Sequence, residues 1–310
     1  MARPRGGPRG RQRSAAILTL VLAVGLAGCG VTASNAPPTG IKAEGPATAH
    51  DLRVVVAGVP KTVGTTAAVS YLLAGASVLG TSPKPVVGSG AFDLRRGVGE
   101  ASLQQPSGDE LVVLGPAVVF SRVPKGAGAA LPKGKTWLSA SLTGSESVST
   151  NFPQFDVQVE AFNPLLYLDE VAWGATAAAP LGSGSVDGTP VHGYVVTTNL
   201  TKALHGATGP SASSMSLAIR SELTSLGPAQ ASSGGGLSVP VLVWVDGAGR
   251  IVMLQGSPPG AGVGTTRITL SDFGITVRAK PPRISKVVDI AQLTPSGERE
   301  NNGGGDADGA

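Results

Sequence analysis

The chain has 310 residues and a formal net charge of +4, with 24 lysines and arginines against 20 aspartates and glutamates. The first 29 residues hold no acidic residue and five of the basic ones, which are Arg3, Arg5, Arg9, Arg11 and Arg13. Without this segment, 19 basic residues stand against 20 acidic ones, for a net charge of −1. The basic balance of the whole chain therefore gives no support to nucleic-acid binding.

An uncharged apolar run from Ala15 to Leu26 follows these arginines. A helix needs about 20 residues to cross the roughly 30 Å hydrocarbon core of a membrane, so this run is too short to span it. A basic segment followed by a short apolar one is typical of a secretory signal. No Arg-Arg pair occurs among the arginines, which favours the general secretory route over the twin-arginine route.

Cys29, the only cysteine, closes the tetrapeptide Leu26-Ala27-Gly28-Cys29 directly after the apolar run. The segment resembles a bacterial lipoprotein signal with its lipobox. The resemblance implies that residues 1–28 are removed and that Cys29 carries a diacylglycerol thioether, with acyl chains such as palmitate, at the extracytoplasmic face of the cell membrane. The alternative is an ordinary buried cysteine. Once Cys29 is acylated, no thiol remains for a disulfide, a thiolate nucleophile or a zinc site.

Composition divides the remainder into three parts. Residues 29–46 contain proline, asparagine and glycine without an apolar period, which predicts a flexible tether. Residues 47–294 are enough for a single large domain. Residues 295–310 are rich in glycine and acidic residues and are expected to be disordered. We interpret Ser232 to Gly236, also glycine-rich, as a loop within the domain.

The first half of the domain has the pattern of an antiparallel meander, because short apolar runs alternate with turn residues. Gly88-Ser89-Gly90 is interpreted as a turn that enters a strand ending at Leu94. The other strands are expected at residues 67–79, 111–114, 117–123 and 135–140.

Two helices and another strand are expected further along. Asn163-Pro164 can open a helix that runs to Trp173, since proline is tolerated in the first turn. A strand follows at Gly193 to Thr198. Ser213 to Leu226 has the spacing of an amphipathic helix, and Gly227-Pro228 ends it.

Residues Val239 to Leu254 predict a tight β-hairpin whose turn is Asp246-Gly247-Ala248-Gly249. Both of its faces are apolar, whereas a strand with one wet face alternates, so both faces should be covered. Helices on one side and loops on the other would do this. Alternatively, one face lines a cavity for an apolar ligand.

Several of these motifs occur in an order similar to that of the actinobacterial LppX/LprG-type lipoproteins, which belong to the LolA-like lipid-carrier superfamily. The C-terminal motifs are Val243-Trp244-Val245-Asp246-Gly247 with Arg250, then Thr269 to Gly274, then Val287-Val288-Asp289. The N-terminal and central motifs are Gly88 to Asp93, Asn163-Pro164 with Leu165 and Leu168, Val186 to Pro190, Tyr194 to Thr197 and Leu200 to Ala203. The resemblance covers most of residues 60–290.

This resemblance implies an α+β fold in which a large curved antiparallel β-sheet, a LolA-like half-barrel, carries helices on its concave side. It also implies a cavity that holds the acyl chains of a lipid or glycolipid, which the protein carries or buffers between membrane and envelope, as a monomer, with a membrane transporter as a further candidate partner. The lining residues expected are Leu111, Val113, Val118, Phe120, Leu165, Leu168, Val195, Val243 and Met253. The alternative is an envelope sensor or protein-interaction lipoprotein with a closed core and no lipid cargo.

The residues offer no constellation for catalysis, and we expect no enzyme, no metal and no cofactor. His50, His192 and His205 are scattered, without the spacing of a zinc motif, and no Gly-x-Ser-x-Gly elbow occurs. Gly260 to Gly264 joins two strands, and no helix follows to receive a phosphate.

Three charged candidates have simpler explanations. Asp246 and Asp272 occupy positions that turn geometry explains. Arg95-Arg96 could meet an anionic headgroup, but a solvated turn is the favoured interpretation.

Overall fold

The computed structural model describes residues 45–74, 85–105, 108–115, 118–122, 131–141, 163–208, 212, 215, 216, 219, 237–256 and 265–292. Contacts divide the chain into two units, Met1–Ser34 and Asn35–Ala310, and every described residue belongs to the second. Cys29, almost all of the expected tether, the two glycine-rich loops and the acidic tail lie outside the described residues. Within those ranges, we find no helix with the length and apolarity to cross a membrane.

The described elements begin with helix α1 (Ala49–Val63) and continue with a run of strands. These are β1 (Thr66–Ala74), β2 (Val86–Asp93), β3 (Val98–Gln105), β4 (Gly108–Leu114), β5 (Val118–Arg122) and β6 (Trp137–Ser141). The second half contains α3 (Pro164–Gly174), β7 (Ala175–Val186), β8 (Thr189–Asn199), α4 (Leu200–Gly206), β9 (Ser238–Asp246), β10 (Ile251–Gly256) and β11 (Thr265–Ser271). Short 3-10 turns, η2 (Ile284–Lys286) and η3 (Ile290–Gln292), flank β12 (Val287–Asp289).

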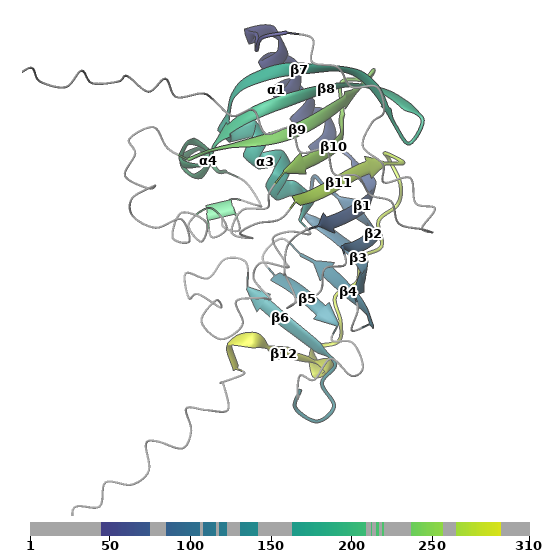
Figure 1. Cartoon of the computed structure of the whole chain (residues 1–310). Coiled ribbons are helices and arrows are strands. Elements are labelled where there is room, and N and C mark those ends of the chain that lie inside the picture. Colours follow the sequence, from purple (N-terminus) through teal and green to yellow (C-terminus); the bar gives the residue numbers. More distant parts are fainter. Residues whose placement is uncertain are drawn as a thin grey trace, which may run out of the picture. The chain divides into compact units, whose positions relative to one another are not determined.

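The strands form one twelve-stranded sheet in the order β12-β6-β5-β4-β3-β2-β1-β11-β10-β9-β8-β7. The sheet consists of two meanders, β1 to β6 and β7 to β11, joined where β1 pairs with β11 in antiparallel register. The pair β12 and β6 is parallel, and every other pair is antiparallel. The expected α+β fold with a large, curved antiparallel sheet is confirmed (Figure 1).

Helices α1 and α3 pack against one face of this sheet, and their contacts are concentrated on β7 to β10 (Figure 1). We call this the helix-side face, and the opposite one the outer face. The helix-side face carries the main apolar cluster, to which α1 contributes Val55 and Val59, and α3 contributes Leu165, Leu168 and Val171. Burial of these apolar side chains is the main force that holds helices and sheet together.

Most of the expected elements are present. The strands expected around residues 67–79, 111–114, 117–123, 135–140 and 193–198 correspond to β1, β4, β5, β6 and β8. The hairpin of Val239 to Leu254 is β9 and β10, and the helix after Asn163 is α3. For the helix expected at Ser213 to Leu226, the structure describes only Met215, Ser216 and Ile219 within that range, and all three are helical.

One interpretation was wrong. Gly88-Ser89-Gly90 is not a turn but the middle of β2, paired with β1 and β3. These glycines serve close approach, since a Cβ on Gly90 would overlap the carbonyl oxygen of Glu100 on β3. Arg95-Arg96 lies exposed in the turn between β2 and β3, as the solvated-turn interpretation expects, and the backbone N–H of Arg96 donates to Asp93 Oδ1 over 3.1 Å.

Candidate functional site

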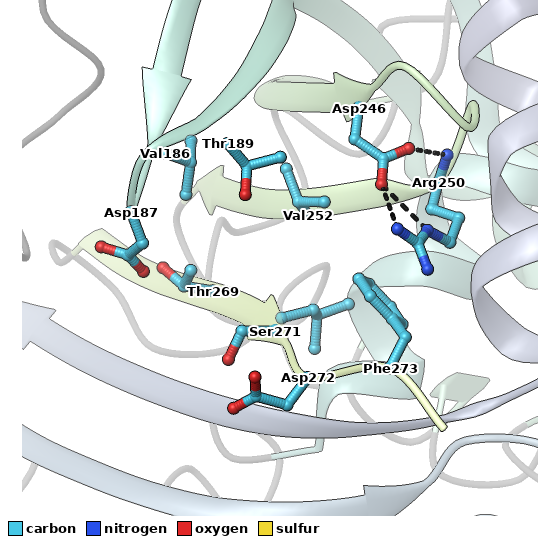
Figure 2. A pocket seen from close by; sticks show the side chains of 11 residues that line it. Val186, Asp187, Thr189, Asp246, Arg250, Val252, Thr269, Ser271, Asp272 and Phe273 are labelled. Atoms are coloured by element: carbon cyan, nitrogen blue, oxygen red, sulfur yellow. Dashed lines mark hydrogen bonds and ion pairs between the residues drawn. The ribbon is translucent and has the colours of Figure 1, made fainter. Parts of the chain in front are cut away.

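Three strand connections on the outer face surround a polar pocket of about 550 Å3 (Figure 2). The turn between β7 and β8 supplies Asp187, the turn between β9 and β10 supplies Asp246 and Arg250, and the end of β11 supplies Asp272 and Phe273. Its remaining lining residues are Val186, Thr189, Val252, Thr269, Leu270 and Ser271. The pocket therefore combines turn residues that are far apart in the sequence.

Asp246 and Arg250 form a partly buried ion pair in the wall of this pocket. Arg250 Nε and Nη2 donate to Asp246 Oδ2 over 2.9 and 2.7 Å, while the backbone N–H groups of Ala248 and Arg250 donate to Oδ1 over 3.0 and 2.8 Å. Burial raises the pKa of the Asp246 carboxyl, but these hydrogen bonds and the Arg250 charge outweigh burial, and the net pKa is lowered. Asp246 therefore stays ionised and closes the hairpin turn.

The guanidinium of Arg250 also lies over the ring of Phe273, 4.2 Å from the ring centroid. This cation–π contact connects the β9–β10 turn to the end of β11. Asp187 and Asp272 both have left-handed backbone conformations, with φ of 47° and 46°, which aspartate tolerates better than most residues. Turn geometry thus explains why aspartate occupies both positions, as expected for Asp272.

Apolar packing on the outer face explains why one of the two faces of the β9–β10 hairpin is apolar. Trp244, Val252 and Met253 are each less than 5% exposed and form a small cluster with Val186 and Val191 of the β7–β8 hairpin. The other hairpin face is covered by the helices. The prediction that both faces are covered is confirmed.

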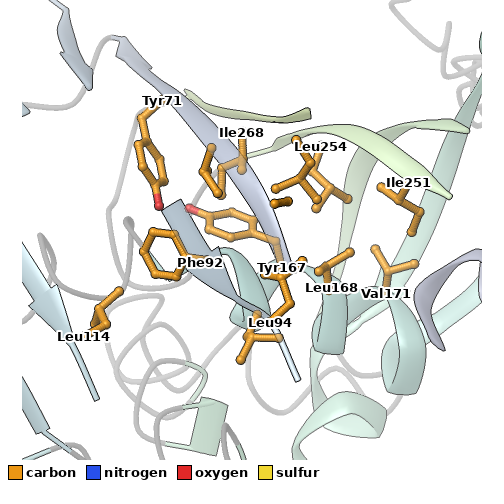
Figure 3. Packing of buried hydrophobic residues seen from close by; sticks show 14 of the residues in the cluster. Tyr71, Phe92, Leu94, Leu114, Tyr167, Leu168, Val171, Ile251, Leu254 and Ile268 are labelled. Atoms are coloured by element: carbon orange, nitrogen blue, oxygen red, sulfur yellow. The ribbon is translucent and has the colours of Figure 1, made fainter. Parts of the chain in front are cut away.

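The second candidate site is the helix-side face itself (Figure 3). Tyr71 of β1 and Phe92 of β2 meet edge to face, with ring centroids 6.4 Å apart, and Tyr167 of α3 lies beside them. Burial, and next the neighbouring Tyr167, raise the pKa of the Tyr71 phenol well above its ordinary value, so it stays neutral. The result is an uncharged aromatic layer between α3 and the centre of the sheet.

Helix α3 is positioned by its first residues. The Asn163 side chain caps it by accepting the N–H of Leu165 over 3.1 Å, and Pro164 occupies its first turn. Helix α3 also carries two acids, Asp169 and Glu170. Glu170 is 1% exposed and accepts a 2.8 Å hydrogen bond from Thr198 Oγ1 of β8, whereas burial raises the pKa of Asp169 to about 7.

Apolar side chains continue along the helix-side face beyond the strands on which the contacts of α1 and α3 are concentrated. Each of these residues is no more than 9% exposed and belongs to the main cluster. They are Leu103 of β3, Val112 and Leu114 of β4, Val119 of β5, and Leu138 and Ala140 of β6. The apolar surface therefore extends over both meanders.

The structure does not bring the nine expected lining residues to one face. Leu165, Leu168 and Val243 belong to the cluster on the helix-side face. The other six point to the outer face, because alternate residues of a strand face opposite ways. They are Leu111, Val113, Val118, Phe120, Val195 and Met253. Their neighbours Val112, Leu114 and Val119 occupy the helix-side positions instead.

The histidines are separate from each other, on α1, β8 and α4, and His192 Nδ1 lies 3.0 Å from Ser183 Oγ. Across the described ranges, no group of three or more histidine, cysteine, aspartate or glutamate side chains could hold a metal ion. The sequence did not predict a site at four of the pocket residues, Asp187, Thr189, Thr269 and Ser271. They lie in the motifs Val186 to Pro190 and Thr269 to Gly274, which served only as part of the family resemblance.

The chain is similar to several solved structures, while neither a family model nor a curated protein sequence matches it. LprF from Mycobacterium bovis is 14% identical, with a TM-score of 0.41, over 77% of this chain and 99% of LprF. The lipoprotein LppX from Mycobacterium tuberculosis is 12% identical, with a TM-score of 0.40, over 74% of this chain and 99% of LppX. A LolA superfamily protein from Nitrosomonas europaea is 7% identical, with a TM-score of 0.25, over 74% and 94%.

Proposed function

We propose that this protein is a lipid-anchored extracytoplasmic carrier that binds acyl chains of a lipid or glycolipid along the helix-side face of its sheet. It binds its cargo without converting it. The observation that carries the proposal is the extent of the apolar surface, which runs from β7 to β6 across both meanders. A face of this size offers a path along which a long acyl chain can lie.

The energetics favour such a site. Each CH2 group removed from water contributes roughly 0.8 kcal/mol, so a few buried methylene groups already give measurable affinity. The helix-side residues of β3 to β5, namely Leu103, Val112, Leu114 and Val119, are all aliphatic and no more than 3% exposed. Such a surface selects ligands by length and volume, so it fits a lipid class better than a single compound.

Helix α3 is the element best placed to control access. It lies against the sheet beside Tyr71 and Phe92, and its sheet-facing residues Leu165, Leu168 and Val171 are no more than 4% exposed. Movement of this helix would uncover the centre of the helix-side face. Acylated Cys29 and the tether would keep that opening near the membrane, where cargo is loaded and released and where a membrane transporter is a candidate partner.

A second candidate function is an envelope sensor or interaction lipoprotein with a closed core. The close packing under α3 favours it, since Tyr71, Tyr167 and Phe92 are each no more than 2% exposed. A closed core would leave no room for an acyl chain in that part of the sheet. Binding would then take place on the surface.

Photo-cross-linking separates these two functions. The chain from Asn35 to Ala310, purified without its anchor, is incubated with a palmitate analogue that carries a photoactivatable diazirine, and the adducts are mapped by peptide mass spectrometry. Carriage predicts adducts at helix-side residues such as Leu103, Val112 and Leu114. The alternate residues Leu111, Val113 and Phe120 on the outer face provide the internal control.

Native mass spectrometry of the same preparation gives an independent readout. A carrier should retain co-purified lipid or take lipid up on incubation. A bare polypeptide mass in every preparation, with no uptake, contradicts carriage and favours the closed core. Adducts confined to outer-face residues would contradict the proposed location.

A further inference from the structure

The polar pocket lies on the outer face, so it is separate from the proposed acyl-chain site on the other side of the sheet (Figure 2). Its residues come from β7, β8, β9, β10 and β11 and the connections after them. The pocket volume of about 550 Å3 lies within the range of roughly 300–1,000 Å3 that is usual for small-molecule sites. A single cation needs far less space.

A threonine that is largely buried lines this pocket, and its hydroxyl faces solvent there. Thr269 lines the pocket and is only 7% exposed, and its Oγ1 makes no hydrogen bond within the described residues. Figure 2 shows it on the pocket wall between Asp187 and Ser271. Because this hydroxyl reaches solvent, a ligand hydroxyl can take the place of water as its hydrogen-bond partner.

The pocket lining carries more negative charges than positive ones. Three carboxylates face one guanidinium, and the Asp246–Arg250 ion pair neutralises one of the three. Asp187 and Asp272 are exposed to solvent and form no ion pair or side-chain hydrogen bond within the described residues. Two carboxylates thus remain as strong acceptors, which favour ligand O–H donors and repel anions.

The remaining groups complete a surface for an amphipathic ring. Thr189 and Ser271 add two hydroxyls that can both donate and accept, and Arg250 Nη1 has no protein acceptor in the described part of the chain. Val186, Val252 and the Phe273 ring provide apolar contact. A sugar ring combines two features that suit this lining. It has hydroxyl groups along its edge and C–H groups on its face.

We propose that this pocket is a binding site for a neutral saccharide of one or two rings. The carboxylates of Asp187 and Asp272 accept hydrogen bonds from the sugar hydroxyls, and Thr269 Oγ1 forms a hydrogen bond with one of these hydroxyls. The inference does not depend on lipid carriage, because the two sites occupy opposite faces of the sheet. The sugar can belong to a free saccharide or to the headgroup of a glycolipid.

NMR titration of the chain from Asn35 to Ala310 tests the site directly. The probes are glucose, mannose and maltose as neutral sugars, glucuronate as a matched anionic sugar, octyl glucoside as an alkylated sugar, and calcium chloride. Neutral sugars should shift the backbone amides of residues 186–189 and 269–273, and glucuronate should bind about tenfold more weakly because of the two carboxylates. Octyl glucoside should shift the same amides as glucose if the headgroup is the recognised part.

Variants assign the effect to the residues. Thr269→Val removes the hydroxyl at nearly constant shape and should weaken sugar binding about fivefold, the usual value of one neutral hydrogen bond. Its matched control is Thr266→Val on the same strand, because Thr266 has a buried Oγ1 without a partner in the described residues and does not line the pocket. Asp187→Asn and Asp272→Asn tolerate the left-handed backbone and should each weaken binding about tenfold.

The proposal is overturned if no neutral sugar shifts the amides, or if calcium chloride alone shifts them. It is also overturned if Thr269→Val and both asparagine variants keep the wild-type affinity, or if octyl glucoside shifts the amides and glucose does not. Loss of sugar binding in Thr266→Val to the same degree as in Thr269→Val would also overturn it. None of these outcomes bears on the palmitate cross-linking, so the two proposals fail separately.

Discussion

Thr62 Oγ1 accepts a 2.8 Å hydrogen bond from the backbone N–H of Ile251, which joins the last turn of α1 to the first residue of β10, 189 positions along the chain. The same hydroxyl donates to the carbonyl of Gly58 over 2.8 Å, and Thr62 is fully buried. Lys61 Nζ donates to the carbonyl of Ala248 in the adjoining turn over 3.3 Å. Helix α1 is therefore fixed on the β9–β10 hairpin by polar contacts as well as by apolar packing.

Thr62→Val should lower the free energy of unfolding by about 1–3 kcal/mol, because it leaves the Ile251 N–H buried without an acceptor. Urea unfolding of residues 35–310 measures this. Thr62→Ser keeps the hydroxyl and loses one methyl group, so its cost should be about 1 kcal/mol. A Thr62→Val midpoint equal to that of wild type would show that the hydrogen bond contributes nothing.

Gly90→Ala should be among the most destabilising substitutions that add a single methyl group to the sheet. The new Cβ would overlap the Glu100 carbonyl oxygen and lie 2.8 Å from the Ala101 Cα, and backbone atoms in a paired strand cannot move aside. Overpacking of this kind costs about 1–3 kcal/mol or more. Gly247→Ala is the control, since no atom lies within 4 Å of its Cβ position. The two variants should differ clearly in thermal midpoint, and similar midpoints would argue against the tight β2–β3 approach.

The sequence predicted those elements whose local signals agree with their environment. Asn163-Pro164 opens α3 because both its capping side chain and its proline suit a first turn. The hairpin turn at Asp246 was predicted because Asp-Gly chemistry and apolar strands coincide. By contrast, α1 was missed: Val54-Val55-Val56, Gly58 and Pro60 lower helix propensity, and packing against β7 to β10 overrides it.

The candidate sites were harder to predict. In β4, Val112, Val113 and Leu114 are all no more than 3% exposed, so the strand shows no alternation that would tell the helix-side face from the outer face. Strand β7 contains Pro180 and two interior glycines, Gly182 and Gly184, which hide its strand character. The pocket depends on three connections that meet only in the folded sheet, so no single sequence window contains it.

Asp246→Asn should destabilise the hairpin by about 1 kcal/mol at neutral pH, less than is usual for hydrogen bonds to charged groups, because the Arg250 side chain is 37% exposed and partly screened by water. The folded-state pKa of Asp246 lies below its ordinary value of 3.8. Its contribution is therefore present above about pH 4 and is lost as the pH falls through the folded-state pKa. The gap in urea midpoint between wild type and Asp246→Asn should narrow on acidification.

Asp272→Asn serves as the matched control for this effect. Asp272 lines the same pocket but forms no ion pair within the described residues. Because Asp272→Asn removes no ion pair, it should not reproduce the loss of stability that Asp246→Asn shows at neutral pH. If Asp246→Asn and Asp272→Asn gave the same profile between neutral and acid pH, the Asp246–Arg250 pair would not be the cause.

Asp169 should act in the opposite sense, because burial raises its folded-state pKa from 3.8 to about 7. Between these two values the folded state holds a proton that the unfolded state has lost, so stability falls as the pH rises through this window and levels off above it. The loss is on the order of 1.4 kcal/mol per pKa unit of the difference between the two states.

Asp169→Asn cannot ionise, so its urea midpoint should stay flat over the same window. The variant should match wild type near pH 4 and exceed it near pH 8, with the exposed Asp187→Asn as the control. A wild-type midpoint that does not fall between pH 4 and pH 7 would show that Asp169 ionises without cost and that α3 is hydrated at this position.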